Sequence, residues 1–195
     1  MRHNLSSTTS RSTNRLLSKQ KKPTATITHL GLRFRVDHYY LKRPRIVEKI
    51  RHDNRIFYAK FERIDALPND TVVQQHLAGD YTVAFPLLDE SKHTDYLVID
   101  YKGEESGRFV ALAKAFMHQE KIERFGLYYG KERHRVQLFI PVSGIKLEEA
   151  EARLKRISEL LEKQMSKSWK TLPSSALPRA YNIVTLPYEA VEDAI

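Results

Sequence analysis

The distribution of apolar residues after residue 66 predicts alternating strands and helices. Short runs of branched and aromatic residues, bounded by Gly, Pro, Asp or Ser, are typical of strands. These runs cover residues 81–88, 94–101, 124–129, 135–142 and 181–186. Apolar residues at helical spacing instead predict helices over 108–120 and 147–165. The order of these elements favours an α+β fold, in which an RRM-like mixed sheet carries helices packed on it.

The same pattern identifies the expected core of this unit. In the helix over 147–165, apolar residues recur along one face, and the other face pairs Glu with Arg or Lys four residues later. The run 94–101 is typical of a buried strand that ends on a carboxylate. The residues predicted to be buried are Leu97, Ile99, Phe116, Leu138, Leu154 and Ile157.

The first 65 residues divide into two segments of different composition, before the domain at 66–195. Residues 1–24 are rich in Ser, Thr and Arg and carry too little apolar surface to offset chain entropy, which predicts a disordered basic arm. Residues 25–65 form a basic region that we expect to hold one or two strands, followed by a helix from Pro44 to Phe61.

Positive charge is concentrated at the N-terminal end of the chain. The formal net charge is +9, yet residues 1–63 contain 16 Lys and Arg against 4 acidic residues, and the remainder has a small acidic excess. Such asymmetry is typical of proteins that bind a polyanion, usually nucleic acid, and a solubilising tail is the alternative. The candidate nucleic-acid ligands in and beside the predicted helix are Arg43, Arg45, Lys49, Arg51 and Arg55.

Composition also restricts the compartment and the chemistry. Cys is absent, which excludes disulfides, thiolate metal sites and a Cys nucleophile, and fits a reducing compartment. No apolar run approaches the roughly 20 residues of a membrane span, so we expect no membrane partner. We therefore expect a cytoplasmic protein. As a secondary alternative, the Arg-rich and Ser-rich residues 1–22 resemble an organelle transit peptide.

Six short motifs follow one another between residues 75 and 187 and resemble those of a known superfamily. They are Gln75-His76-Leu77-Ala78-Gly79, Ala84-Phe85-Pro86-Leu87-Leu88, Val98-Ile99-Asp100-Tyr101-Lys102, Arg135-Val136-Gln137-Leu138-Phe139-Ile140, Leu172-Pro173-Ser174-Ser175-Ala176 and Asn182-Ile183-Val184-Thr185-Leu186-Pro187. Through them, residues 54–188 resemble the archaeo-eukaryotic primase superfamily, most closely the primase-polymerase domain of TOTE conflict systems and related mobile elements. The resemblance implies that 66–195 is a primase-like, RRM-like core.

The resemblance also implies a metal site, from which this chain departs. The family places Asp-x-Asp at a strand end, where residues i and i+2 share a face and two carboxylates can bridge divalent metals. This sequence keeps Asp100, but Lys102 replaces the second acid. Ala176 replaces the third acid, and Arg135 aligns with the family's His. His134 is one residue out of register and would reach the site only through a β-bulge.

Two uses of the altered strand end remain open. Asp100 and Lys102 can form a structural ion pair, or basic side chains here can meet a phosphate backbone directly, without a metal. The candidate phosphate ligands of this second group are Lys102, Lys131, Arg133 and Arg135. Neither use requires a cofactor, and Mg²⁺ or Mn²⁺ would be needed only by an active enzyme.

Three functions fit these observations. We favour a catalytically degenerate primase-polymerase-like protein that binds DNA or RNA, with a protein partner, as a subunit of a replication, mobile-element or defence complex. The first alternative is a protein-interaction scaffold with a primase fold. The second is an active primase or polymerase with an unorthodox site, for which Asp100 and His134 are the remaining catalytic candidates. Metal-dependent nucleotide incorporation identifies the enzyme, and salt-dependent nucleic-acid binding separates the binding protein from the scaffold.

Overall fold

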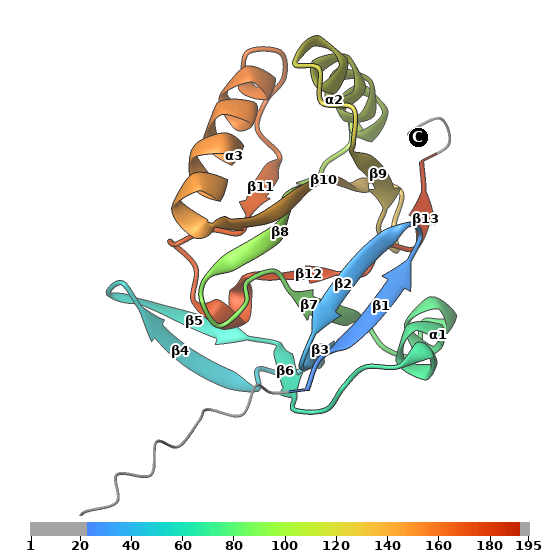
Figure 1. Ribbon diagram of the computed structural model, residues 1–195, viewed down its shortest axis with the longest axis vertical. Coiled ribbons are helices and arrows are strands. Elements are labelled where there is room, and N and C mark those ends of the chain that lie inside the picture. The colour runs from blue at the N-terminus through green and yellow to red at the C-terminus, as the bar shows by residue number, and fades with distance from the viewer. Residues whose placement is uncertain (1–22, 192–195) are drawn as a thin grey trace, which may run out of the picture.

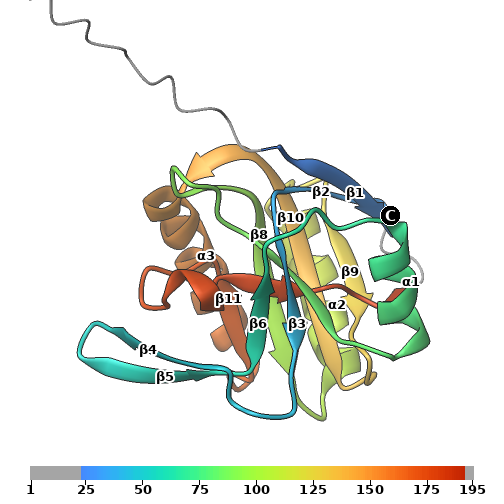
Figure 2. The same cartoon turned by 90° about the horizontal axis from the view of Figure 1, so that it is seen from below.

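Three layers are stacked in the computed structural model, which describes residues 23–191 (Figures 1 and 2). Two helices form the first layer, a five-stranded sheet forms the middle layer, and shorter strands form the third. The predicted α+β class is confirmed by this arrangement. The predicted transit peptide at 1–22 lies outside the described residues, as does the predicted basic arm at 1–24 except for its last two residues.

The middle sheet is built from strands that precede and follow each helix. Its elements in chain order are β8 (His93–Lys102), α2 (Ser106–Gln119), β9 (Gly126–Tyr129), β10 (Arg135–Lys146), α3 (Leu147–Glu162), β11 (Trp169–Leu172) and β13 (Glu189–Ala190). The spatial order is β11-β8-β10-β9-β13. Every described pair is antiparallel, so the prediction of a mixed sheet is corrected to an antiparallel one. Strand β8 lies inside the sheet between β11 and β10, and its apolar residues contribute to a core on each face.

The helices bury one face of this sheet. The apolar stripe of α3 lies against β8 and β10, and α2 covers the neighbouring part of the same face. Five of the predicted core residues are buried there, and Phe116 is partly buried at the edge of the cluster. The five are Leu97, Ile99, Leu138, Leu154 and Ile157.

Short strands cover the other face of the middle sheet. They are β1 (Ala25–His29), β2 (Leu32–Val36), β3 (Tyr39–Lys42), β6 (Phe61–Ile64), β7 (Val83–Pro86) and β12 (Ile183–Thr185). Strands β1 and β2 form a hairpin, and the others form a sheet in the order β12-β7-β3-β6. Phe34 and Phe85 of this layer share a core with Val98 and Phe139 of the middle sheet. Both faces of the middle sheet are therefore covered.

Two predicted strands belong to this third layer rather than to the middle sheet. We expected the runs 81–88 and 181–186 in one sheet with β8, and that prediction is wrong. Strand β7 pairs instead with β3 and β12, because the N-terminal strands supply an edge close to it. Ahead of β7 lies helix α1 (Asp70–Ala78), which begins after Asn69 and ends at Gly79 with a left-handed φ of 85°.

A hairpin occupies the segment that we predicted to be helical from Pro44 to Phe61, so that prediction is wrong. Strands β4 (Glu48–His52) and β5 (Arg55–Ala59) pair antiparallel. The turn residues Asp53 and Asn54 have φ angles of 44° and 61°, as a tight type I′ turn requires. We call this hairpin the β4–β5 ribbon. It projects from the body of the molecule (Figures 1 and 2).

Candidate nucleic-acid interface

A cleft of about 690 Å³ opens where the end of β8 meets the beginnings of β10 and β11, against the third layer. Cations dominate its lining. The lining cations are Lys42, Lys102, Lys131, Arg135, Lys167 and Lys170, and the lining acids are Asp100 and Glu132. Clustered charge of one sign in a hollow with low-dielectric walls concentrates the field, so this cleft attracts anions.

Asp100 is neutralised by a cation from the neighbouring strand. Its side chain is only 3% exposed, and Arg135 donates to it from Nε at 2.8 Å and from Nη2 at 2.6 Å. Lys170 Nζ lies 3.9 Å from the same carboxylate. Burial acts to lower the pKa of the Arg135 guanidinium, but the hydrogen bonds and charge of Asp100 raise that pKa above its ordinary value. Arg135 therefore stays charged, and the pair is fixed.

The predicted ion pair between Asp100 and Lys102 is replaced by this pair. Arg135 lies directly opposite Lys102 in the β8–β10 register, and its long side chain reaches diagonally to Asp100. Lys102 is exposed and lines the cleft. The structure therefore brings Lys102 and Arg135 together, as predicted, but only the first remains available to a ligand without breaking an existing ion pair.

The remaining positions of the implied metal site lie elsewhere. His134 is 40% exposed in the turn before β10, with its Nε2 3.0 Å from Glu132 Oε2. The β8–β10 register runs unbroken from Arg135 to Pro141, so the bulge that would have placed His134 in the site is absent from that stretch. Ala176 is exposed in the loop after β11.

The donor set does not fit the divalent metal that the resemblance implies. Both oxygens of Asp100 are occupied by Arg135, and a guanidinium beside them repels a second cation. Within residues 23–191, no group of three or more His, Asp or Glu side chains is arranged to hold a metal ion.

Gln137 links the two strand layers beside the cleft, a role that the sequence analysis missed. It lies opposite Asp100 in the β8–β10 register and is fully buried. Its Nε2 is 3.2 Å from both the carbonyl oxygen and Oγ1 of Thr185. The signal that identifies it is an amide between Val136 and Leu138 in a run of buried residues, since buried polar groups need partners.

Lys131 and Arg133, the two predicted phosphate ligands in the turn before β10, lie on different surfaces. Lys131 lines the cleft. Arg133 instead pairs with Glu189 at 2.9 Å and stacks on Tyr129, with 4.8 Å between its Cζ and the ring centroid. Lys131 thus joins the cleft, and Arg133 belongs to an exposed surface cluster outside its lining.

The N-terminal candidates form a second basic surface on and beside the β4–β5 ribbon. Arg43 pairs with Glu62 at 2.6 Å and is partly exposed. Exposed cations follow it along the chain at Arg45, Lys49, Arg51 and Arg55. None of these five lines the cleft, although Lys42 on its wall directly precedes them in sequence. Lys49, Arg51 and Arg55 therefore lie on a ribbon rather than on the predicted helix, with Arg55 on the face opposite Lys49 and Arg51, and Arg43 and Arg45 lie before the ribbon.

A buried histidine supports one wall of the cleft. His76 of α1 is fully buried, its Nε2 lies 3.0 Å from the Leu186 carbonyl oxygen, and its Nδ1 accepts from the Val83 backbone N–H at 3.1 Å. Burial lowers the pKa of His76 to about 4, and the charges of His29 and Lys131 act in the same direction. The neutral ring thereby fixes Leu186, which lines the cleft.

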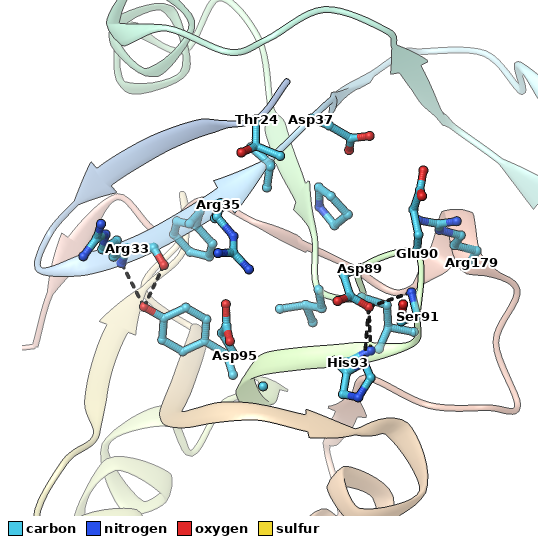
Figure 3. A pocket seen from close by; sticks show the side chains of 17 residues that line it. Thr24, Arg33, Arg35, Asp37, Asp89, Glu90, Ser91, His93, Asp95 and Arg179 are labelled. Atoms are coloured by element: carbon cyan, nitrogen blue, oxygen red, sulfur yellow. Dashed lines mark hydrogen bonds and ion pairs between the residues drawn. The ribbon is translucent and has the colours of Figure 1, made fainter. Parts of the chain in front are cut away.

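A second pocket, of about 330 Å³, lies between β2 and the connection from β7 to β8 (Figure 3). Its charged side chains have both signs. They are Arg33, Arg35, Arg179, Asp37, Asp89, Glu90 and Asp95. Asp89 Oδ1 accepts from the backbone N–H groups of Ser91 and His93, each at 2.8 Å, and so orders this connection. With no net excess of cations, this pocket favours no polyanion.

Comparison with known families and proteins assigns no function to this chain. Residues 26–95 match DUF1882, a domain of unknown function. The match covers the strands of the third layer other than β12, together with the β4–β5 ribbon and α1, and it ends within β8 before Asp100. The chain matches none of the curated proteins with which it was compared. In the part of the chain that the structure describes, no helix has the length and apolar character to cross a membrane.

Proposed function

We propose that this protein binds nucleic acid by its phosphate backbone, as a catalytically degenerate relative of the primase-polymerases. The observation that carries the proposal is the charge of the side chains that line the cleft. Its one deeply buried carboxylate, Asp100, is held by Arg135, and five further cations line the same hollow. Phosphates can enter such a site without a bridging metal, and each contact releases counterions.

The connectivity around the cleft supports the primase-like part of the proposal. Elements β8 to β11 follow one another as βαββαβ, and their strands lie in the order fourth, first, third, second. This is the order of a split βαβ motif, which supports the proposal of an RRM-like core. Asp100 lies at the end of the first strand, where the superfamily places its first catalytic acid. Lys102 and Arg135 face the same cleft with basic groups in place of catalytic ones.

Because both faces of the middle sheet are covered, nucleic acid would bind elsewhere on this unit. RRM domains stack bases on an open sheet face. Here Tyr96, Tyr128 and Phe139 on that face are buried beneath the third layer, so they cannot stack on bases. The basic cleft at the strand ends is accessible and rich in cations, which favours backbone contacts over base stacking.

Fluorescence anisotropy with labelled single-stranded DNA and RNA, titrated at several salt concentrations, tests the proposal. Replacing Lys102, Lys131 and Lys170 together with Gln should weaken binding at least tenfold. If each lysine contacts one phosphate of a single strand, the slope of log K against log salt should become shallower by about 2, at about 0.7 per phosphate. The matched control replaces Lys146, Lys155 and Lys163 of the α3 region with Gln and should leave both quantities unchanged.

Two outcomes would overturn this function. Failure of the wild-type protein to bind either nucleic acid at low salt would favour the protein-interaction scaffold. Nucleotide incorporation in Mg²⁺ or Mn²⁺ that is lost in Asp100→Ala would identify an active polymerase or primase, whereas we expect no incorporation by the wild-type protein.

A further inference from the structure

The β4–β5 ribbon has two faces of different character. On one face, Ile50 and Phe57 turn toward the body, where the Phe57 ring lies 5.0 Å from that of Tyr181. The ribbon is also tied down near its tip, because His52 Nε2 lies 2.9 Å from the Ser175 carbonyl oxygen. These contacts hold the ribbon in a fixed direction, although it projects from the body (Figure 1).

The opposite face is exposed and combines cations with large apolar side chains. Lys49 lies opposite Tyr58, and Arg51 lies opposite Ile56, so the four side chains share the outer face. Ile56 is 53% exposed and Tyr58 is 51% exposed. Lys49 Nζ lies 5.7 Å from the Tyr58 ring centroid. Exposed apolar residues gathered in this way indicate an interaction surface rather than a solvated one.

We propose that the β4–β5 ribbon inserts its outer face into the major groove of B-form duplex DNA. The proposal rests on the nucleic-acid binding proposed above and adds a second contact with a different form of the ligand. The major groove of B-DNA is about 12 Å wide and admits a two-stranded ribbon. The major groove of A-form RNA is too deep and narrow for such an element.

Charge and chemistry both favour this occupant. Residues 43–60 contain six Lys and Arg against two acidic residues. Lys49 and Arg51 can reach the phosphates at the groove edge, whereas Ile56 and Tyr58 offer apolar contact to thymine methyl groups. The cores of protein interfaces, by contrast, are depleted in charged residues, and on this face each apolar side chain has a cation directly opposite.

Anisotropy with a 20-base-pair DNA duplex, the corresponding RNA duplex and single-stranded DNA tests the inference. Lys49→Gln with Arg51→Gln should weaken binding to duplex DNA and make the salt slope shallower by about 1.8, at about 0.9 for each phosphate. Ile56→Thr with Tyr58→Thr should weaken duplex binding about tenfold and leave the slope unchanged. Methylation of guanine N7, which lies in the major groove, should weaken binding of the wild-type protein more than that of the Thr variant.

The controls separate failure of this inference from failure of the proposed function. Lys155→Gln with Lys163→Gln should change nothing, and both ribbon variants should keep wild-type affinity for single-stranded DNA. Unchanged affinity of both ribbon variants for duplex DNA would overturn the inference and assign the outer face to a protein partner. In that case, loss of single-strand binding in the cleft variant would still support the proposed function. Circular dichroism confirms that each variant is folded.

Discussion

Replacing Arg135 with Met removes the guanidinium and keeps most of the side-chain volume, which isolates the ion pair at the floor of the cleft. Asp100 is 3% exposed and would lose two hydrogen bonds of 2.8 and 2.6 Å. Removing one partner of a buried pair costs about 3–5 kcal/mol, because the other charge stays buried. Arg135 is itself 28% exposed, and Lys170 stays 3.9 Å from the carboxylate. We therefore expect the lower end, about 3 kcal/mol.

Urea unfolding followed by circular dichroism measures this loss. A cost of about 3 kcal/mol lowers the folding equilibrium constant roughly a hundredfold and moves the midpoint without changing the slope. The double variant Asp100→Asn with Arg135→Met should recover most of the stability, because no uncompensated charge remains. Arg133→Met, which breaks an exposed pair with Glu189, should cost less than about 1 kcal/mol.

A cost for Arg135→Met no larger than that for Arg133→Met would contradict the assignment of a buried charge to this pair. The same assignment fails if the double variant is as unstable as the single one, since the cost would then come from lost packing rather than from the isolated carboxylate.

Two further predictions concern the core and its response to pH. Leu154→Ala should cost about 2–5 kcal/mol in the same urea assay, because Leu154 is 1% exposed between α3 and the sheet, whereas the exposed Lys155→Ala should cost less than about 0.5 kcal/mol. Between its ordinary pKa of 6.5 and its folded value of about 4, His76 binds more protons unfolded than folded. The free energy of unfolding should therefore fall by about 3 kcal/mol in total as the pH drops through this window. His76→Gln should flatten this dependence of stability on pH, whereas His118→Gln, at an exposed position, should not. An equal slope in wild type and His76→Gln would contradict this assignment.

The apolar pattern predicted the elements from β8 onward more reliably than those before them. Helices α2 and α3 have apolar faces at helical spacing, and the strands β8, β9 and β10 are apolar runs bounded by polar residues or Gly. The same pattern failed between Pro44 and Phe61, because Ile50 and Phe57 are seven residues apart. That spacing fits one face of a helix and also fits a cross-strand pair around a two-residue turn. The Asp53–Asn54 turn was the distinguishing signal.

The sequence predicted where the candidate site lies better than it predicted which side chains contact one another there. Alternation along β8 placed Asp100 and Lys102 on one face, as the structure has them. The partner of Asp100 depended on the register between β8 and β10, which the sequence does not specify on its own. Gln137 was missed because its role depends on Thr185, a residue of another layer. Contacts between layers follow from packing, which no local pattern encodes.

Alternation at the end of β8 also constrains how this surface can evolve. Tyr101 stacks on Phe109, with 4.6 Å between ring centroids, in the core beneath the helices. Lys102, next to it on the opposite face, is free to mutate without repacking that core. Asp100 is not, since it is tied to Arg135. A lineage that passes between a carboxylate site and a basic one can therefore change residue 102 independently, whereas a change at residue 135 leaves the buried charge of Asp100 without its partner.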